Sequence, residues 1–319
     1  MHTCMFRVIL CLALLTGCMR YSPPPQQRMA TPSKQRPSAS PNRQILEGEK
    51  TASTSVNKSQ NRTQEKKMTE TNIQPTAETG QSADEQFKNG VIPYTLGMQT
   101  KSRNCTTSDL EGIHALGATW FRRGFYWNAI EPRKGTYDFT AYDRLLADAR
   151  RLRLGVIACL FGGNKHYEND GQGGIQREAG REGFARFAAA CAKRYANERI
   201  IWEIWNEPNV RTFWRKNGQH NSPEFAREYT LLVRQTVPAM RKADPDCVVL
   251  AGSVSCFWEP SFRWVQSCFA QGIAECGISG WSVHPYGLKT PEEFTAGYAR
   301  MRQIMRSAMG GKVLPLYNT

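Results

Sequence analysis

The sequence lacks any close grouping of cysteine and histidine. Its ten cysteines include no pair separated by two residues, and its five histidines lie far apart along the chain. Structural zinc sites and dithiol redox sites need such spacings, so we expect no metal site. Seven cysteines follow Cys18, and an odd number leaves at least one thiol free or paired between chains.

A long apolar run is also absent from the first residues. The apolar stretch at 8–15 follows Arg7 and is too short to span a bilayer as a permanent helix, which is typical of a secretory signal. The next residues, Leu-Thr-Gly-Cys at 15–18, resemble the bacterial lipobox, in which cleavage precedes a lipid-bearing cysteine. We therefore expect a lipoprotein signal peptide at 1–17, with Cys18 anchoring the protein to a membrane of the cell envelope. The alternative is a plain signal peptide cleaved after a small residue.

Residues 18–89 contain few large apolar side chains and many Pro, Ser, Thr, Gln, Asn and Lys residues. Such a segment cannot bury enough apolar surface to offset its loss of conformational entropy, so we expect a disordered tether. The net charge is +14, yet the part at 90–319 contains no long basic run and no recognised nucleic-acid motif. We therefore expect no nucleic-acid partner. A solvated surface near anionic lipid is favoured over binding of an acidic glycan.

The pattern of residues 90–319 alternates between strands and helices. The segment at 154–161 is continuously apolar, as a strand covered on both faces should be. Ser222 followed by Pro223 predicts the start of a helix over 223–243. Six such strand–helix units precede a seventh strand at 310–319. The length and order favour a (β/α)8 TIM barrel, incomplete at the C-terminus, over an open doubly wound sheet.

The most distinctive string is Trp-Glu-Ile-Trp-Asn-Glu-Pro-Asn at 202–209. A strand that ends in Asn206, Glu207 and a proline places an amide and a carboxyl group at its carboxyl end, because proline stops the ladder. Parallel barrels carry their chemistry at this end of the strands. The alternative is an ordinary strand-to-loop junction with a solvated glutamate.

Two further strings accompany it. Residues 130–139 are Ile-Glu-Pro-Arg-Lys-Gly-Thr-Tyr-Asp-Phe, and residues 281–287 are Trp-Ser-Val-His-Pro-Tyr-Gly. Together the three strings resemble clan A glycoside hydrolases, and the form at 202–209 is most similar to family 39 and its relatives. The resemblance covers residue 91 to the last residue.

The resemblance implies a role for five residues. Glu207 would be the acid/base, and Asn206 would bind the 2-hydroxyl of the sugar. His284 and Tyr286 would line the sugar subsite, and Arg122 would orient the carboxylates. From the residues alone, His284 could equally be a core or turn histidine and Arg122 could form an interior or surface salt bridge.

Four tryptophans are candidate stacking platforms for the faces of sugar rings, namely Trp127, Trp214, Trp258 and Trp281. Each has core packing as its alternative. Trp127 and Trp214 are favoured, because they lie in the loops after the second and fourth strands.

The resemblance further implies a retaining double displacement without a cofactor, by two carboxyl groups about 5–5.5 Å apart. In this clan the nucleophilic glutamate directly follows the seventh strand, and here the sequence ends at Thr319. The leading prediction is a lipid-anchored retaining β-glycosidase that acts on a poly- or oligosaccharide and is truncated just before its nucleophile. The alternatives are a carbohydrate-binding lipoprotein without catalysis and a basic surface protein that binds anionic polymers through its tether.

Overall fold

A computed structural model describes residues 96–100, 105–168, 173–215 and 217–319. The predicted signal peptide, the lipid anchor at Cys18 and the predicted tether lie outside these residues, as does most of the predicted first strand. None of the helices within the described ranges is both long and apolar enough to cross a membrane.

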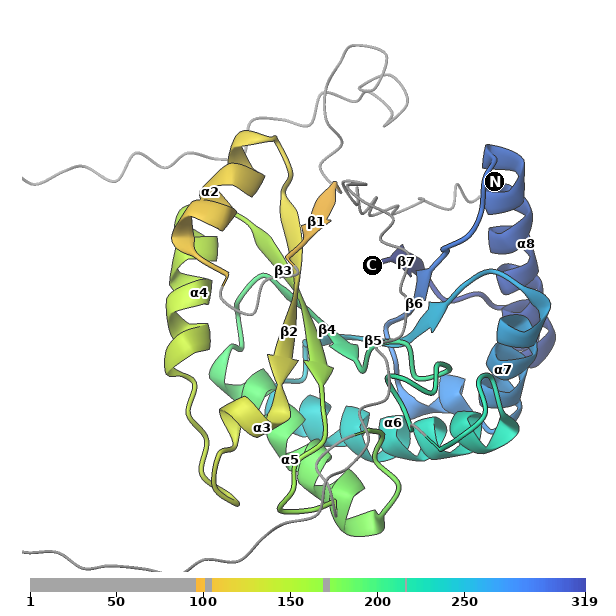
Figure 1. The fold of residues 1–319 in the computed structure, drawn as a ribbon, viewed down its shortest axis with the longest axis horizontal. Helices are drawn as coiled ribbons and strands as arrows, with labels where there is room; N and C mark the ends of the chain where they lie inside the picture. The colour runs from red at the N-terminus through yellow and green to blue at the C-terminus, as the bar shows by residue number, and fades with distance from the viewer. Residues whose placement is uncertain (1–95, 101–104, 169–172, 216) are drawn as a thin grey trace, which may run out of the picture. The chain divides into compact units, whose positions relative to one another are not determined.

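The described residues form one parallel sheet of seven strands, whose order in the sheet follows the chain (Figure 1). Each strand is hydrogen-bonded to the next in parallel register. The strands are β1 (Gly97–Gln99), β2 (Trp120–Tyr126), β3 (Gly155–Phe161), β4 (Ile200–Ile204), β5 (Val248–Ser255), β6 (Gly280–His284) and β7 (Leu316–Asn318).

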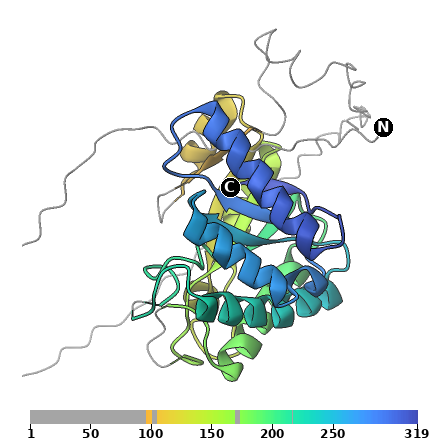
Figure 2. The same cartoon turned by 90° about the vertical axis from the view of Figure 1, so that its right-hand side faces the viewer.

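The helices lie in an arc around the outside of the curled sheet (Figure 1), and α6, α7 and α8 cover one side of it (Figure 2). This arrangement is an incomplete (β/α)8 barrel and confirms the predicted fold class. The helices are α2 (Thr107–Ala115), α3 (Trp127–Ile130), α4 (Thr140–Arg151), α5 (Glu178–Arg194), α6 (Pro223–Ala243), α7 (Glu259–Ala270), the 3-10 helix η1 (Ile273–Cys276) and α8 (Pro291–Ala308).

Local hydrogen bonds explain where the helices begin. The Ser222 hydroxyl accepts the Phe225 N–H and caps α6 at the predicted residue. The amphipathic pattern at 183–197 predicts a helix that starts at residue 183. Helix α5 begins five residues earlier, at Glu178. The Glu168 carboxylate accepts the backbone N–H groups of Gln176 and Arg177 just ahead of it, and a carboxylate stabilises a helix N-terminus.

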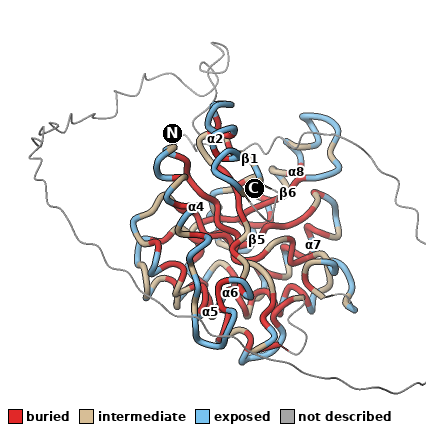
Figure 3. The backbone as a smooth tube through the Cα atoms, turned by 60° about the vertical axis from the view of Figure 1, so that its left-hand side comes forward, coloured by how far each residue is buried: buried red, intermediate tan, exposed pale blue. Residues whose placement is uncertain are grey.

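The apolar side chains form two clusters, one on each face of the sheet, and the strands are largely buried (Figure 3). The larger cluster lies between the sheet and the helices. The smaller one lies inside the curve and contains Ile157, Ile201, Leu250 and Tyr317. Because side chains alternate along a strand, β3 contributes Ile157 to the inner cluster and its neighbours to the outer one. Both faces of the sheet are therefore packed, as the continuous apolar strands predicted.

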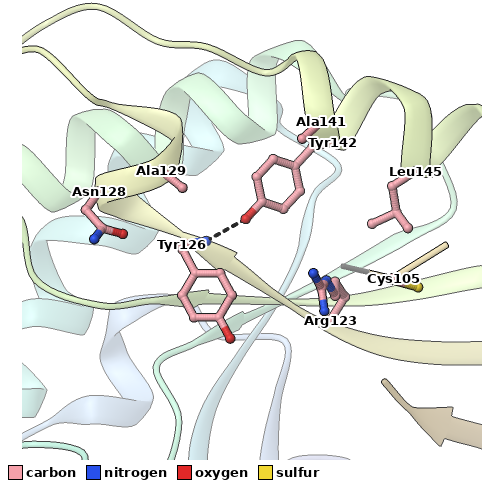
Figure 4. Close-up of a pocket in the computed structure, with 8 residues that line it drawn as sticks. All are labelled: Cys105, Arg123, Tyr126, Asn128, Ala129, Ala141, Tyr142 and Leu145. Atoms are coloured by element: carbon pink, nitrogen blue, oxygen red, sulfur yellow. Dashed lines mark hydrogen bonds between the residues drawn. The ribbon is translucent and has the colours of Figure 1, made fainter. Parts of the chain in front are cut away.

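The carboxyl-terminal half of β2 extends beyond the short β1, which pairs only with Trp120, Phe121 and Arg122. Tyr142 of α4 compensates for the missing strand: its hydroxyl accepts the Tyr126 N–H at 2.9 Å and donates to the Gly124 carbonyl at 3.3 Å (Figure 4). Burial raises the pKa of Tyr142 to about 12. A cavity of about 500 Å³ lies at this edge, lined by Cys105, Arg123, Tyr126, Asn128, Ala129, Ala141, Tyr142 and Leu145.

We expect Tyr142→Phe to destabilise the protein by about 1–2 kcal/mol, because both backbone groups lose their partner. Thermal unfolding should show this as a decrease in Tm of a few degrees, at about 2–4 °C per kcal/mol for a domain of this size. Tyr298→Phe is the matched control, since Tyr298 is half-buried and its ring packs against Phe257. Equal changes in Tm for the two variants would contradict the bridging role of the Tyr142 hydroxyl.

Candidate active site

The chain turns sharply where β4 ends. The Trp205 N–H still donates to the Leu160 carbonyl at 2.9 Å, so the ladder with β3 extends past β4 by one residue. Trp205 and Glu207 both adopt left-handed backbone conformations, with φ of 69° and 47°. Such conformations cost about 1–3 kcal/mol each for a non-glycine residue and are concentrated at functional sites. The buried Trp205 ring fixes the turn by donating from Nε1 to the Phe213 carbonyl.

The turn brings Glu207 against His284, the last residue of β6. Glu207 Oε1 lies 2.8 Å from His284 Nδ1. The two residues are 8% and 2% exposed, so the contact is formed largely away from water. A carboxyl group and an imidazole are both side chains that can give and accept a proton. The pair therefore has the chemistry of a proton donor and acceptor, at the carboxyl ends of two strands.

The other ring nitrogen of His284 faces two hydroxyl groups. Nε2 lies 3.2 Å from both Ser253 Oγ and Thr319 Oγ1. Ser253 Oγ is also 3.5 Å from the Glu207 backbone nitrogen. One serine hydroxyl thus contacts both members of the Glu207–His284 pair, and these contacts fix the ring of His284 relative to the turn.

A β-bulge in β5 places Ser253 there. Between the pairs Ala251–Trp281 and Val254–Val283, two residues of β5, Gly252 and Ser253, lie opposite one residue of β6, so β5 contains one additional residue. Gly252 and Ser253 have φ of 109° and 49°. A Cβ at Gly252 would clash with the Ser282 carbonyl oxygen, so the bulge requires glycine. Bulges re-aim side chains, and this one turns the Ser253 hydroxyl into the site.

Arg122 of β2 links the centre of the sheet to the turn after β4. Its Nε donates to Glu203 Oε2 at 2.8 Å, its Nη2 also binds Glu203, and Nη2 donates to Asn206 Oδ1 at 2.9 Å. Arg122 and Asn206, both predicted site residues, are therefore in contact. Arg122 holds the Asn206 side chain in one orientation, with its NH2 group directed away from the guanidinium.

Glu203 was not among the predicted site residues. It is fully buried and accepts a hydrogen bond from Thr319 Oγ1 at 2.7 Å in addition to those from Arg122. Burial raises the pKa of the Glu203 carboxyl, but the charges of Arg122 and His284 together with hydrogen bonds from Thr319 and Ser282 outweigh it, and the net pKa is lowered. Glu203 is thus a buried anion that fixes Arg122. A charged residue within an otherwise apolar strand was the signal for it in the sequence.

Asn209 is a second residue that the sequence reasoning missed. It is buried, and it bonds to both backbone groups of Ser255: Oδ1 accepts the N–H at 3.0 Å and Nδ2 donates to the carbonyl at 3.2 Å. Nδ2 also donates to Asn221 Oδ1 at 2.9 Å. These bonds attach the loop that carries Glu207 to the end of β5, so Asn209 is a positioning residue.

Tyr286 lies two residues beyond His284 on the same strand end. Its ring is 53% exposed and meets the His284 ring edge-on, with 5.6 Å between the centroids. The structure therefore brings together side chains from three strands that are not adjacent in the sheet: Arg122 of β2, Asn206 and Glu207 after β4, and His284 and Tyr286 at the end of β6.

Trp127 and Trp214 lie elsewhere, and their prediction as sugar-stacking residues is wrong. Both side chains are fully buried, which leaves no ring face for a sugar. Trp127 Nε1 donates to Glu131 at 2.5 Å and Trp214 Nε1 donates to Glu228 at 2.8 Å. The sequence indicates that both tryptophans follow strands. It does not indicate whether such a ring packs into the core beneath its loop or faces the open carboxyl end of the barrel.

No group of three or more His, Cys, Asp and Glu side chains in the described ranges is arranged to hold a metal ion. The cavity beside Tyr142 contains none of the five predicted residues around Glu207 (Figure 4).

A curled parallel sheet with outer helices, and with polar side chains gathered at the carboxyl ends of its strands, defines a protein of the TIM-barrel class. The model of the cellulase family, glycosyl hydrolase family 5, matches residues 82–295. The chain belongs to this family. The sequence motifs had favoured family 39, a family of similar fold, and the shared class of clan A glycoside hydrolases is confirmed.

Solved structures of similar fold include family 39 enzymes. A family 39 glycoside hydrolase from Bacteroides cellulosilyticus WH2 has a TM-score of 0.56 at 20% identity, over 70% of this chain and 48% of that one. The family 39 enzyme from Xanthomonas axonopodis pv. citri has a TM-score of 0.56 at 20% identity, over 71% and 50%. A monomeric β-xylosidase from Caulobacter crescentus CB15 has a TM-score of 0.54 at 18% identity, over 70% and 50%.

At this level of identity, the likeness shows the fold alone. The chain spans about half the length of these structures. The comparison with curated proteins gives no match.

Proposed function

We propose that the protein is a retaining β-glycosidase that hydrolyses O-glycosidic bonds of an oligo- or polysaccharide, with Glu207 as its acid/base. The observation that carries this proposal is the 2.8 Å contact between Glu207 and His284 at the carboxyl ends of β4 and β6. Family membership supports the reaction class. The motif at 202–209 supports a closer relation to family 39 within the clan.

In the proposed reaction, Glu207 gives its proton to the leaving glycosidic oxygen and later takes a proton from the attacking water. After it has given up its proton, Glu207 is a carboxylate and can accept the proton of water, so one side chain serves in both steps. The contact with His284 Nδ1 orients it. Arg122 holds Asn206 through its Oδ1, which leaves the amide NH2 of Asn206 free to donate to the sugar 2-hydroxyl. This contact strengthens as positive charge develops on the sugar ring.

A retaining mechanism needs a second carboxylate at the anomeric carbon. Glu203 does not fit this role, because it is fully buried and a sugar cannot reach it. Thr319, the residue after β7, lies 3.2 Å from His284 Nε2 and donates to Glu203 at 2.7 Å, so the carboxyl end of β7 borders the same centre.

The proposal is tested by turnover of aryl β-D-xyloside, β-D-glucoside and β-D-galactoside, with the anomer of the first-formed product followed by NMR. The β-xyloside is the first probe because a solved structure of similar fold is a β-xylosidase. We expect hydrolysis of at least one substrate with retention of the β configuration. Release of the α anomer would contradict double displacement, and binding of sugars without turnover would favour a carbohydrate-binding protein.

Ser253→Ala should lower kcat about tenfold with little change in KM, because the hydroxyl orients His284 and the Glu207 turn without being placed to bind substrate. Steady-state kinetics on the best aryl glycoside measures this. Ser267→Ala on α7 is the control, since its hydroxyl accepts a hydrogen bond from the Gln271 side chain at the end of the same helix. An unchanged kcat for Ser253→Ala would remove Ser253 from the positioning network.

We further propose that the protein is exported and held at the cell envelope by lipid on Cys18. The short apolar run and the lipobox-like string ahead of Cys18 support this. Cells grown with a labelled fatty acid should incorporate the label into the protein, and Cys18→Ala should abolish incorporation. A labelled Cys18→Ala protein would contradict the anchor.

A further inference from the structure

Trp258 differs from the other tryptophans of this protein. All eight tryptophans lie in the described ranges, and Trp258 is the one that is exposed, at 54%. Single exposed apolar side chains are common on protein surfaces, so exposure alone implies nothing. Two further observations bear on a role in binding: which contacts hold the backbone around Trp258, and how close the residue lies to the candidate active site.

The connection between β5 and α7 holds Trp258 rigidly. Phe257, the residue before it, is buried and packs against Phe262 and Tyr298, with centroid distances of 5.8 and 5.1 Å. A Cβ at Gly297 would overlap the Phe257 ring, so α8 approaches this anchor closely. The Trp258 carbonyl accepts the Phe262 N–H at 3.0 Å in the first turn of α7. A ring presented by a fixed backbone loses little entropy when it binds a ligand.

The same connection is attached to the candidate active site. Ser255 pairs with His284 across β5 and β6, and the Cys256 N–H donates to the His284 carbonyl at 2.9 Å. Trp258 follows Cys256 by two residues, a span of at most about 7 Å along the backbone. Its indole side chain is therefore within a few sugar lengths of the Glu207–His284 pair. On the neighbouring strand end, Tyr286 is the other exposed ring of this region, at 53%.

We propose that Trp258 forms a stacking subsite for a pyranose ring of a β-linked oligosaccharide, one or two units away from the bond that is cleaved. The inference rests on the proposed function and extends it to substrate length. The apolar face of a pyranose packs on an exposed indole, while its hydroxyl groups remain in water at the rim. A substrate of several units reaches Trp258, whereas a single aryl glycoside reaches only the groups around Glu207.

The test measures binding of xylohexaose and cellohexaose by calorimetry in the Glu207→Gln background, in which turnover of these unactivated substrates is expected to be about 10²–10⁴-fold slower. Adding Trp258→Ala should weaken binding of the preferred hexasaccharide about tenfold. A loss of this size is typical when an aromatic side chain that anchors an interface is truncated to alanine. Adding Trp258→Phe should weaken it less, because a smaller aromatic face remains. Leu116→Ala is the matched control: Leu116 is 61% exposed but lies at the end of α2, before β2 begins.

Fluorescence gives a second readout on the same proteins. Acrylamide should quench Trp258 more than the buried rings, and the hexasaccharide should protect it from quenching. Hexasaccharide binding that is equal in Trp258→Ala and in the Leu116→Ala control would overturn the subsite while leaving the proposed function intact. Failure of the parent protein to bind either hexasaccharide, while the native protein turns over an aryl glycoside, would overturn the subsite and leave the proposed function intact. Absence of turnover of all three aryl glycosides would overturn the proposed function, on which the subsite rests.

Discussion

Replacing Glu207 by glutamine is expected to lower kcat/KM for an unactivated β-linked disaccharide by about 10²–10⁴-fold, the usual contribution of a positioned general acid/base. Glutamine keeps the size of the side chain but cannot give a proton to the leaving oxygen. A dinitrophenyl glycoside should lose less in the bond-breaking step, since its leaving group departs without protonation. The comparison of the two substrates therefore isolates proton transfer from binding.

Addition of azide gives a second test of the acid/base role of Glu207. With Glu207→Ala, the small anion can enter the space of the missing carboxylate and attack the sugar in place of water, so turnover of the dinitrophenyl substrate should recover and yield a glycosyl azide. Glu182→Gln is the control, because Glu182 is an exposed residue on the outer helix α5. Undiminished turnover of the disaccharide by a folded Glu207→Gln protein would refute the assigned role.

Arg122→Met is expected to lower the free energy of unfolding by about 3–5 kcal/mol, because it leaves the carboxylate of Glu203 buried without its cation. Chemical denaturation followed by circular dichroism measures this loss. The double variant Arg122→Met with Glu203→Met should be more stable than Arg122→Met alone, since removing both charges also removes the cost of burying one. A double variant less stable than the single one would contradict this account of the pair.

The same pair predicts a pH dependence. In the native protein the pKa of Glu203 is lowered, so its contribution to stability is present above the ordinary glutamate pKa of about 4.3 and is lost as the pH falls through the folded value. In Arg122→Met, burial acts without the cation, and the Glu203 pKa should rise above its ordinary value. Stability should then fall as the pH rises, which reverses the sign of this contribution. Denaturation curves between pH 4 and 7 for the two proteins check the reversal.

The sequence predicted the fold well because strands covered on both faces are continuously apolar and helices begin at recognisable caps. The run at 154–161 became β3, and Ser222 with Pro223 marked the start of α6. The first helical residue of α5 was misplaced, since the group that supports it, Glu168, comes from a preceding loop. A contact of this kind depends on how the chain folds, so no local pattern in the sequence indicates it.

The candidate site was predicted in part. Asn206, Glu207 and His284 belong to strings long enough to be recognised, and the structure places Glu207 and His284 in contact. Ser253 and Asn209 act through partners far away in sequence, so nothing adjacent to them indicated their contacts. The tryptophans show the same limit: burial of Trp127 and exposure of Trp258 follow from how the loops fold back on the barrel.

The bulge in β5 makes the number of residues in this strand as important as their identity. Val249 and Ala251 pack in the outer cluster and Leu250 in the inner one, and unbroken alternation would turn Val254 inward. The additional residue of the bulge shifts the alternation of side chains by one position, so Val254 faces outward and packs in the outer cluster. Deleting one residue here would leave Val254 facing outward but would remove the bulge that turns the Ser253 hydroxyl toward His284. Insertions in the connecting loops leave the alternation of the strand unchanged. Variation in length should therefore be tolerated in the loops and excluded at this one point of the barrel wall.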